Sequence, residues 1–346
     1  MKKFLASDES NFVFIDNILG DYKEKLLDAT FLITGGTGFF GTWFLNYFQY
    51  LNNNYKYNIR ATVLSRNPEI FLKKHKNLIC ENFNFITSNI KDVDHLDKFK
   101  NYDYFLHMAT TSAYETFTGS DLDKFEVLYD GTSNILNLIK NNSFKKFLFT
   151  SSGAVYGQHN NLINEDNGLN INTISLKNTL AIAKICTEHL ISNFFKDNSK
   201  FVIARCFSFI GPGLPLDLHY AVGNFINNVL NDEDIVITGS GNEYRSYLDI
   251  RETIAWLIIL LVSKNQKNIY NIGSDQKISI YELASRIKEI FNSNKNIIVL
   301  KKNQSYGNLY KNIYVPNIDL FKKEFQVEQT ISLDESLNFI KKNSNE

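Results

Sequence analysis

The feature of this sequence that most constrains its fold is a regular alternation of short apolar runs with segments of helical periodicity. The apolar runs have the length of single strands, and they cover residues 29–34, 59–66, 83–90, 103–110, 145–152 and 200–211. Strands that alternate with helices in this way form a parallel sheet whose two faces are both covered by helices. Because connections between parallel strands are right-handed, the sequence predicts an α/β fold with a doubly wound parallel sheet.

A glycine-rich turn follows the first of these runs. The segment TGGTGFFG, from Thr34 to Gly41, lies between a predicted strand and a predicted helix. Its glycines at 35, 38 and 41 permit a tight turn and a close approach of the backbone to a ligand. The N-terminus of the helix beyond them presents free N–H groups to a pyrophosphate. Within an alternating sheet, this turn predicts a Rossmann-type dinucleotide-binding domain.

The end of the second predicted strand indicates which nicotinamide cofactor is bound. An acidic residue at this position would bind the free hydroxyls of the adenosine ribose, but the chain has Ser65 and Arg66. The planar guanidinium of arginine suits the oxygens of a 2′-phosphate. We therefore expect NADP rather than NAD. The alternative is that Arg66 simply faces solvent.

Charge and hydropathy exclude several classes of partner. The 346 residues include 37 basic and 37 acidic side chains, so the chain lacks the positive excess that nucleic acid or an anionic membrane surface would attract. The longest apolar run, residues 253–262, is shorter than the roughly 20 residues that cross a bilayer, and we expect it to form a buried helix. No histidine or cysteine has metal-ligand spacing. We expect a soluble cytoplasmic protein without a metal, nucleic-acid or membrane partner.

The sequence pattern changes after Gly211. Short strands and helical segments are mixed from there on, and no repeat or low-complexity linker separates the two parts. We expect residues 1–207 to form the nucleotide-binding domain, with a polar lead-in up to about Asp28. Residues 208–346 are expected to form a smaller mixed α/β lobe for the substrate, partly interleaved with the first domain.

Four sequence features occur in the order typical of one superfamily. They are TGGTGFFG from Thr34, SSGAVYG from Ser151, the lysine at Lys184, and ARCFSFIGP from Ala204. With them the chain resembles the extended short-chain dehydrogenase/reductase superfamily and, within it, the nucleotide-sugar epimerase/dehydratase family. The resemblance extends from about residue 29 to about residue 273, and more loosely afterwards. It implies an NAD(P)-binding sheet domain, a C-terminal substrate lobe and an active site between them.

The resemblance also assigns roles to particular residues. The implied cofactor site comprises Gly35, Thr37, Gly38, Phe39, Phe40, Gly41, Ser65, Arg66, Asn89, Ile90, Met108, Ala109, Thr110 and Lys184. The implied substrate site comprises Thr111, Ser112, Ser152, Ser208, Asn224 and Arg245. Arg245 matches an arginine that grips the nucleotide diphosphate of the substrate. Asn89 stands where many family members have an aspartate.

The helix that carries Lys184 departs from the family in its reaction chemistry. Family members remove a hydride from a sugar carbon while a tyrosinate takes the hydroxyl proton. The lysine four residues later holds the nicotinamide ribose and lowers the tyrosine pKa, and a serine, matched here by Ser152, hydrogen-bonds the reacting oxygen. Leu180 occupies the tyrosine position. Losing a positioned acid–base group lowers a rate by about 10²–10⁴-fold, so we expect impaired oxidation of a sugar alcohol.

Three explanations of Leu180 stay open. The leucine is a substitution made to trap a complex, or it is natural and another group or a water carries the proton, or the protein has become a binding module. Tyr156 is the nearest other phenol in the sequence. Because it belongs to the turn of the SSGAVYG segment, we expect it to have a structural role.

A second departure concerns elimination of water. Family members that are 4,6-dehydratases resemble one another in an Asp-Glu pair directly after the catalytic serine or threonine, and these carboxyl groups act as acid and base. This chain has Gly153 and Ala154 at the two positions. Neither residue transfers protons, so the sequence disfavours a dehydratase of that type.

The leading hypothesis is an NAD(P)-dependent nucleotide-sugar epimerase that serves surface-polysaccharide precursor synthesis, a pathway expectation that comes from the resemblance alone. The alternatives are a 4-keto-6-deoxy nucleotide-sugar reductase or dehydratase, and a non-catalytic nucleotide-sugar binding protein. The family commonly dimerises through two helices of each subunit, which correspond here to residues 123–140 and 176–195. We therefore expect a homodimer, with Leu136, Ile139, Leu190 and Phe194 as candidate apolar contacts.

Overall fold

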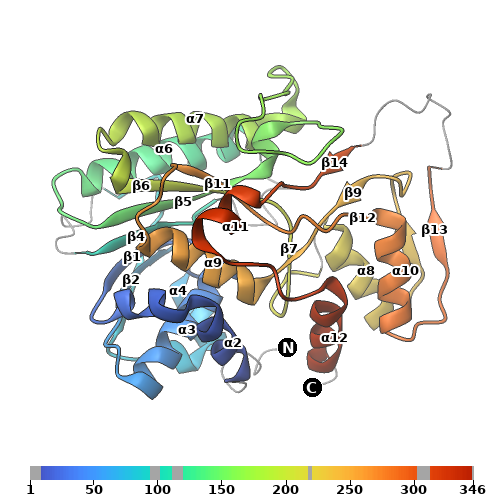
Figure 1. Ribbon diagram of the computed structural model, residues 1–346, viewed down its shortest axis with the longest axis horizontal. Helices are drawn as coiled ribbons and strands as arrows, with labels where there is room; N and C mark the ends of the chain where they lie inside the picture. The colour runs from blue at the N-terminus through green and yellow to red at the C-terminus, as the bar shows by residue number, and fades with distance from the viewer. Residues whose placement is uncertain (1–8, 94–101, 111–119, 217–219, 302–311, 345–346) are drawn as a thin grey trace.

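The centre of the molecule is a parallel sheet. This computed structural model describes residues 9–93, 102–110, 120–216, 220–301 and 312–344. Within these residues the sheet has seven strands in the order β11-β6-β5-β4-β1-β2-β3, all of them parallel (Figure 1). The strands are β1 Thr30–Thr34, β2 Arg60–Ser65, β3 Phe83–Thr87, β4 Tyr104–His107, β5 Lys146–Ser152, β6 Phe201–Cys206 and β11 Ile269–Ile272. The predicted doubly wound α/β fold is confirmed.

Helices cover both faces of the sheet, as Figure 1 shows. One face carries α6 Asp121–Ile139 and α7 Thr179–Phe194. The other carries α2 Ser10–Leu19, α3 Phe39–Tyr55, α4 Pro68–Lys74, α9 Ile250–Val262 and α11 Asp319–Phe325. Because both faces are covered, every strand of the sheet except the edge strand β3 is buried almost throughout and reads in the sequence as a largely apolar run.

The apolar run predicted as a buried helix is the second half of α9. Residues 252–262 of this helix are all buried, and the Trp256 ring stacks on Phe321 of α11 with 4.6 Å between ring centroids. A helix that is apolar on all sides is stable only when other elements surround it. The expected buried helix is therefore confirmed, and it lies between the sheet and the outer helix α2.

The N-terminal segment, predicted only as a polar lead-in, forms the helix α2. Phe12, Ile15 and Leu19 of α2 are buried in the same core cluster as α3 and α9. The Tyr47 hydroxyl donates a hydrogen bond of 2.5 Å to the Asp16 carboxylate, which ties α2 to α3. So short a helix is marginal in isolation. Its stability comes from packing, which the local sequence does not reveal.

Two of the apolar residues predicted to lie in a dimer interface are instead in the core of the subunit. Leu136 and Ile139 on α6 are at most 1% exposed and pack among the residues of β4, β5 and β6. Leu190 and Phe194 on α7 are partly buried and pack against the same cluster. The prediction for Leu136 and Ile139 was wrong, because a helix covering a sheet turns its apolar stripe toward that sheet.

The remaining elements form the C-terminal lobe, seen on the right of Figure 1. Its helices are α8 Ala221–Leu230, α10 Ile280–Ile290 and α12 Leu333–Ser344. Its strands are β7 Phe209–Ile210, β8 Ile235–Ile237, β9 Tyr244–Arg245, β10 Leu248–Asp249, β12 Ile278–Ser279, β13 Ile297–Val299 and β14 Ile313–Tyr314. In the three-stranded sheet β12-β9-β14, β14 runs parallel to β9 and pairs Tyr314 with Arg245.

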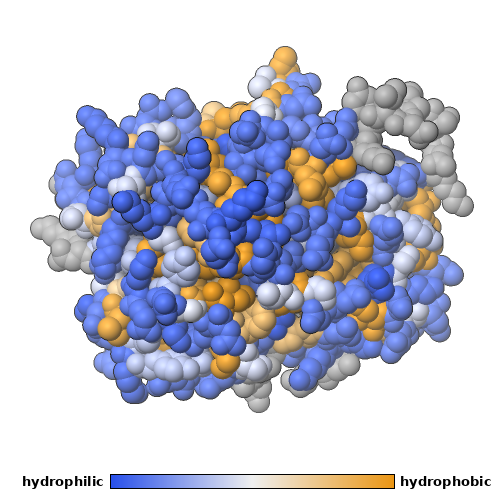
Figure 2. Space-filling view, in the orientation of Figure 1, coloured by the Kyte–Doolittle hydropathy of each residue, from blue (hydrophilic) through white to orange (hydrophobic). Residues whose placement is uncertain are grey.

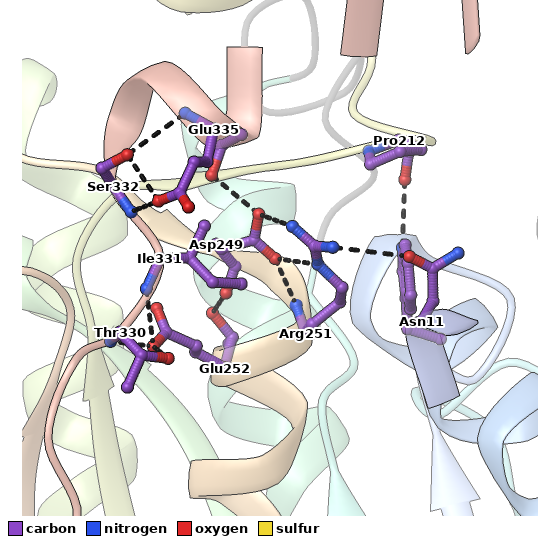
Figure 3. A network of polar contacts seen from close by, with 12 residues as sticks. Asn11, Pro212, Asp249, Arg251, Glu252, Thr330, Ile331, Ser332 and Glu335 are labelled. Carbon is purple, nitrogen blue, oxygen red and sulfur yellow. Dashed lines mark hydrogen bonds and ion pairs between the residues drawn. The ribbon is translucent and has the colours of Figure 1, made fainter. Parts of the chain in front are cut away.

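A buried polar network joins the C-terminal segment to the start of α9 (Figure 3). Arg251 donates to both carboxylate oxygens of Asp249, at 2.8 and 2.9 Å, and Ser336 of α12 donates to the same group at 2.7 Å. Glu252 accepts hydrogen bonds from the backbone of Thr330 and from that of the residue after it. Buried charges need such partners, so the network holds the lobe against the sheet domain.

The surface of one face is largely hydrophilic (Figure 2). On the face in Figure 2, hydrophilic residues dominate, and hydrophobic residues gather mainly in the middle, where helices of the sheet domain meet the lobe. Within the described ranges, no helix combines the length and the hydropathy needed to cross a bilayer.

Candidate active site

A cavity of about 1450 Å³ lies between the carboxyl ends of the sheet strands and the C-terminal lobe. In the sheet order, β1 lies between β4 and β2, so the chain changes direction at this point, which is where ligands bind in open α/β sheets. Residues from both parts of the molecule line the cavity, including Gly35 and Met108 from the sheet domain and Arg245 from the lobe.

Most of the predicted site residues meet in this cavity. Those predicted for the cofactor that line it are Gly35, Thr37, Gly38, Phe39, Phe40, Ser65, Arg66, Asn89, Ile90, Met108, Ala109, Thr110 and Lys184. Ser152, Leu180, Ser208 and Arg245 also line it. Asn224 is half-buried on α8 and is not among the lining residues, while Thr111 and Ser112 fall outside the described residues.

The glycine turn has the geometry that a close-approaching backbone needs. Gly35 has a φ of +72°, and a Cβ added to it would lie 2.6 Å from the Met108 carbonyl carbon. Gly38 precedes the first residue of α3, so the free N–H groups of that helix begin at the cavity wall. This position suits a pyrophosphate, because free N–H groups at a helix N-terminus bind anions.

Gly41 has a different role from Gly35 and Gly38. It does not line the cavity, and a Cβ at this position would lie 2.3 Å from the Cα of Gly36. Its missing side chain therefore lets α3 pack closely against the turn that precedes it. Gly41 therefore shapes the site through backbone packing and does not itself face the cavity.

The cavity has a strongly one-sided charge. Of the described residues that line it, Arg66, Lys74, Lys184 and Arg245 are cationic, and no aspartate or glutamate is among them. The Ser65 hydroxyl lies 3.1 Å from that of Thr37, and Arg66 is exposed at the cavity edge. Such a lining favours ligands that carry several phosphate groups.

The lining of the cavity has two parts, a cofactor wall and a reaction wall. The cofactor wall comprises the glycine turn 35–40, the strand ends 65–66 and 89–90, and residues 108–110. The reaction wall comprises Ser152, Leu180, Lys184 and Phe207. Every described residue of both walls comes from the sheet domain or from the segment directly after β6.

Lys184 is the charged residue of the reaction wall, and its side chain is buried. Its ammonium donates a 2.7 Å hydrogen bond to the Thr150 carbonyl and lies 4.5 Å from the centre of the Phe149 ring. Burial lowers the pKa of Lys184 to about 8, and the nearby Cys206 and Glu188 oppose that shift. The lysine is thus held rigidly at the end of β5, next to Ser152.

Leu180 faces the cavity one helical turn before Lys184. It is half-buried and lines the cavity together with Ser152 and Lys184, as expected from the four-residue spacing. The side chain that stands at the predicted phenol position is therefore an aliphatic one. The Ser152 hydroxyl accepts a hydrogen bond of 3.1 Å from the Ala154 N–H, so its own proton stays available for another acceptor.

Gly153 makes room for an aromatic ring. A Cβ at this position would lie 2.7 Å from atoms of the Phe207 ring. The space that an acidic side chain would need is therefore filled by Phe207, which itself lines the cavity. This agrees with the sequence argument against a dehydratase that uses an Asp-Glu pair.

Tyr156 does not line the cavity, although its ring stacks on Phe207 with 6.2 Å between ring centroids. Its hydroxyl donates a 2.8 Å hydrogen bond to Asn271, and the Arg205 guanidinium lies 4.7 Å from its ring centroid. Arg205 in turn forms a buried ion pair with Glu188 at 2.6 Å. Both residues therefore belong to the packing between β6, α7 and β11.

Sequence reasoning missed Tyr314, which lies on β14 beside the reaction wall. Its ring centroid is 4.8 Å from that of Phe207, and the Arg245 guanidinium lies 5.5 Å from it on the other side. Burial raises the pKa of Tyr314 to about 12, and Ser152 and Arg245 oppose that shift. No local pattern marks this tyrosine, because its neighbours in space come from distant parts of the chain.

The chain matches a known family over most of its length. The sequence pattern of the NAD dependent epimerase/dehydratase family covers residues 31–273. The chain belongs to this family. This family lies within the extended short-chain dehydrogenase/reductase superfamily that the sequence resembles. The span contains both walls of the cavity, whereas Tyr314 lies beyond it.

Individual relatives differ in the reactions for which they are named. The chain is 30% identical over 284 residues to dTDP-D-glucose 4,6-dehydratase of Dictyostelium discoideum, covering 78% of this chain and 63% of the relative. It therefore spans less than two thirds of that relative's length.

Two solved structures have the same fold. One is UDP-N-acetylglucosamine 4-epimerase of Methanobrevibacter ruminantium M1 in complex with UDP-N-acetylmuramic acid, with a TM-score of 0.77, 22% identity and coverage of 91% of this chain and 97% of that one. The other is UDP-glucuronic acid 4-epimerase of Bacillus cereus with UDP-glucuronic acid and NAD, with a TM-score of 0.75, 22% identity and coverage of 91% and 99%.

Proposed function

We propose that this protein is an NAD(P)-dependent nucleotide-sugar epimerase, which oxidises a sugar carbon transiently and reduces it again. The observation that carries the proposal is the cavity lining, with four cationic side chains and no acidic one among the described residues. Both a dinucleotide and a nucleoside diphosphate sugar present phosphates to such a lining. Family membership supports hydride transfer as the reaction class.

The residues of this chain divide the work in the proposed reaction. The glycine turn and the N-terminus of α3 hold the cofactor pyrophosphate, and Lys184 holds the ribose next to the nicotinamide. When bound, the nicotinamide supplies a site that accepts and returns a hydride. Ser152 hydrogen-bonds the reacting sugar oxygen, and Arg245 grips the diphosphate of the substrate.

The second candidate is a 4-keto-6-deoxy nucleotide-sugar reductase. It is favoured by Tyr314, because burial raises the pKa of this phenol to about 12 although Ser152 and Arg245 lower it. A phenol that stays protonated at neutral pH suits the protonation of a ketone oxygen better than the removal of a hydroxyl proton. A dehydratase that does not use an Asp-Glu pair and a non-catalytic nucleotide-sugar binding protein are the remaining alternatives.

The proposal includes three finer expectations. The cofactor is NADP, since Arg66 and Lys74 line the cavity near the strand end where a 2′-phosphate would lie. The protein forms a homodimer through the outer faces of α6 and α7, and size-exclusion chromatography with light scattering tests this. It acts in the cytoplasm on precursors of a surface polysaccharide.

One experiment separates the candidate functions. The protein is incubated with NADP or NAD and with UDP-glucose, UDP-N-acetylglucosamine, UDP-glucuronic acid or a 4-keto-6-deoxy dTDP-sugar. An epimerase converts the substrate to its epimer, detected by NMR, with no net change in reduced nicotinamide absorbance. A reductase consumes NADPH in proportion to product. Binding of both ligands by calorimetry with no turnover, even after Leu180→Tyr, would overturn the proposal in favour of a binding protein.

A further inference from the structure

A chain of buried hydrogen bonds runs behind the cofactor wall, from α6 through His107 to the backbone of Ala109. His107 is the last residue of β4, and its side chain is 1% exposed and does not line the cavity. The residues directly after it, 108–110, belong to the cofactor wall. We propose that His107 is a positioning residue, which holds this part of the cofactor wall in place relative to Lys184 of the reaction wall. The inference rests on the proposed hydride-transfer function.

The first half of the chain joins β1 to the cofactor wall. The Ala109 N–H donates to the Thr34 hydroxyl oxygen at 3.2 Å, and the same oxygen lies 2.7 Å from Nδ1 of His107. Thr34 ends β1 and comes directly before Gly35. A Cβ at Gly35 would lie 2.6 to 2.7 Å from atoms of the peptide that joins Met108 to Ala109. These hydrogen bonds therefore fix the peptide on which the glycine turn packs.

The second half joins His107 to α6 and sets the position of the imidazole proton. Nε2 of His107 lies 2.8 Å from the Thr132 hydroxyl oxygen, and that hydroxyl donates to the Leu128 carbonyl at 2.5 Å. A hydroxyl has one proton, so Thr132 accepts from Nε2–H. Nδ1 then accepts from the Thr34 hydroxyl, which is free to accept in turn from the Ala109 N–H. The hydrogen-bond network thus assigns the Nε2–H tautomer to His107.

The same stretch of α6 also holds another strand end of the cofactor wall. Two residues after Thr132, the Asn134 amide donates to the carbonyls of Ile90 and Lys91, at 3.1 and 3.0 Å. Ile90 lines the cavity. Helix α6 therefore supports two separate segments of the cofactor wall, one of them directly and the other through His107.

The imidazole also supports the reaction wall, through the ring of Phe149. His107 stacks on this ring, with 5.5 Å between ring centroids and 23° between the planes. The Lys184 ammonium lies 4.5 Å from the centre of the same ring and is attracted by its electron-rich face. Burial lowers the pKa of His107 to about 3, and the Lys184 charge lowers it further. A neutral His107 can therefore lie close to this cation without repelling it.

A change at the far end of the chain isolates its effect on the cofactor wall. Thr132 is fully buried and does not line the cavity. Without its hydroxyl, the Nε2–H of His107 loses its acceptor, and an unpaired buried donor is costly. We expect the imidazole to move, and the Met108–Ala109 peptide with it, because Thr34 joins the two. A misplacement of about 1 Å between reacting groups lowers a rate by about 10²-fold.

The test compares Thr132→Val, which removes the hydroxyl at nearly constant shape, with Thr132→Ser, which keeps it. Thr253→Val is the matched control. Thr253 is also a fully buried helical threonine that donates to the carbonyl four residues earlier, but it belongs to α9 and does not line the cavity.

The probes are NADP in a fluorescence titration and, for turnover, NADPH with a 4-keto-6-deoxy dTDP-sugar or NADP with UDP-glucose. We expect Thr132→Val to lower kcat by about 10–100-fold and to raise the NADP dissociation constant about tenfold. The KM for the sugar nucleotide should stay within twofold. Thr132→Ser and Thr253→Val should stay within threefold of the wild type in all three quantities.

A second measurement does not depend on turnover. Nitrogen-15 NMR of labelled imidazoles distinguishes Nε2–H from Nδ1–H, and the His107 signal is recognised by its contacts with the Phe149 ring. We expect a neutral imidazole with its proton on Nε2 between pH 5 and 8, with or without NADP.

Each outcome decides for or against the role of His107. A proton on Nδ1, or an imidazole that becomes charged between pH 5 and 8, overturns the inference and leaves the proposed function standing. So does a kcat of Thr132→Val equal to that of Thr253→Val, or a Thr132→Ser variant as slow as Thr132→Val. If the wild type turns over no substrate while NADP affinity falls in Thr132→Val alone, His107 positions the cofactor wall as inferred and the proposed function fails. If NADP affinity is then also unchanged, both fail.

Discussion

The cofactor wall and the reaction wall face the same cavity but are assembled differently. The cofactor wall consists of short contiguous segments that follow sheet strands. The reaction wall draws on three separate segments, and it departs from the pattern at Leu180 and at the neighbouring Gly153. Nucleotide binding therefore needs little beyond a strand, a turn and a helix, whereas proton transfer depends on how distant segments meet.

The largest effect is expected at the reaction wall. Ser152→Ala removes the cavity-lining hydroxyl that we propose to hydrogen-bond the reacting sugar oxygen. We expect the turnover number to fall by about 10²–10⁴-fold. The dissociation constant for NADP, measured by fluorescence titration, should stay within twofold, because the cofactor wall is unchanged. A parallel loss of NADP binding would show that the two walls are not separable.

The next effect is expected at the glycine turn. Gly35→Ala adds a Cβ that would lie 2.6 Å from the Met108 backbone, at a φ of +72°. Strain of about 2–3 kcal/mol at this position corresponds to a loss of about 10²-fold in NADP affinity. The matched control is Gly168→Ala, where a Cβ meets nothing within 4 Å. Equal NADP affinities for the two variants would contradict the close-approach role of Gly35.

A smaller and more selective effect is expected at Arg66. Replacing it with alanine removes the exposed guanidinium at the end of β2. We expect NADP to bind about 10–100-fold more weakly, with NAD unaffected, because a charge-assisted hydrogen bond contributes about 1.5–3 kcal/mol. The control is Arg60→Ala, an exposed arginine at the other end of the same strand. If the affinities for NAD and for NADP fall by the same factor, Arg66 does not recognise the 2′-phosphate.

The smallest effect is expected away from both walls, at Glu252 in the network of Figure 3. Burial raises the pKa of Glu252 from 4.5 to about 7. The resulting stability is fully present below pH 4.5 and is lost as the pH rises through about 7. Glu252→Gln stays neutral, so we expect it to be more stable than the wild type by about 1–2 kcal/mol at pH 8 and equal to it at pH 5.

Urea unfolding at the two pH values measures this difference. Glu289→Gln is the control, since the Glu289 carboxylate is largely exposed and pairs only with Arg286 on the surface of α10. An equal change for Glu252→Gln at pH 5 and pH 8 would assign the effect to lost hydrogen bonds with Thr330 rather than to the proton. NADP affinity should be the same in all these variants, because neither Glu252 nor Glu289 lines the cavity.

The sheet and the cofactor wall could be read from the sequence because their signals are local. Each buried parallel strand is an apolar run of five or so residues, and the glycine turn places strand, ligand and helix within one short segment. The resemblance to the family grouped Ser152, Leu180 and Lys184, and helical spacing put Leu180 and Lys184 on one face of α7. Neither argument found α2, whose stability depends on packing against α9.

By itself, the sequence determined the family, the glycine turn between strand and helix, and the absence of a phenol at position 180 of α7. Only the tertiary structure decided which residue of the C-terminal lobe packs against the reaction wall. The physical reason is that β14 reaches the reaction wall through its pairing with β9 and the packing of Tyr314 on Phe207. Contacts between residues so far apart in the chain depend on the folded backbone as a whole, and no local pattern encodes them.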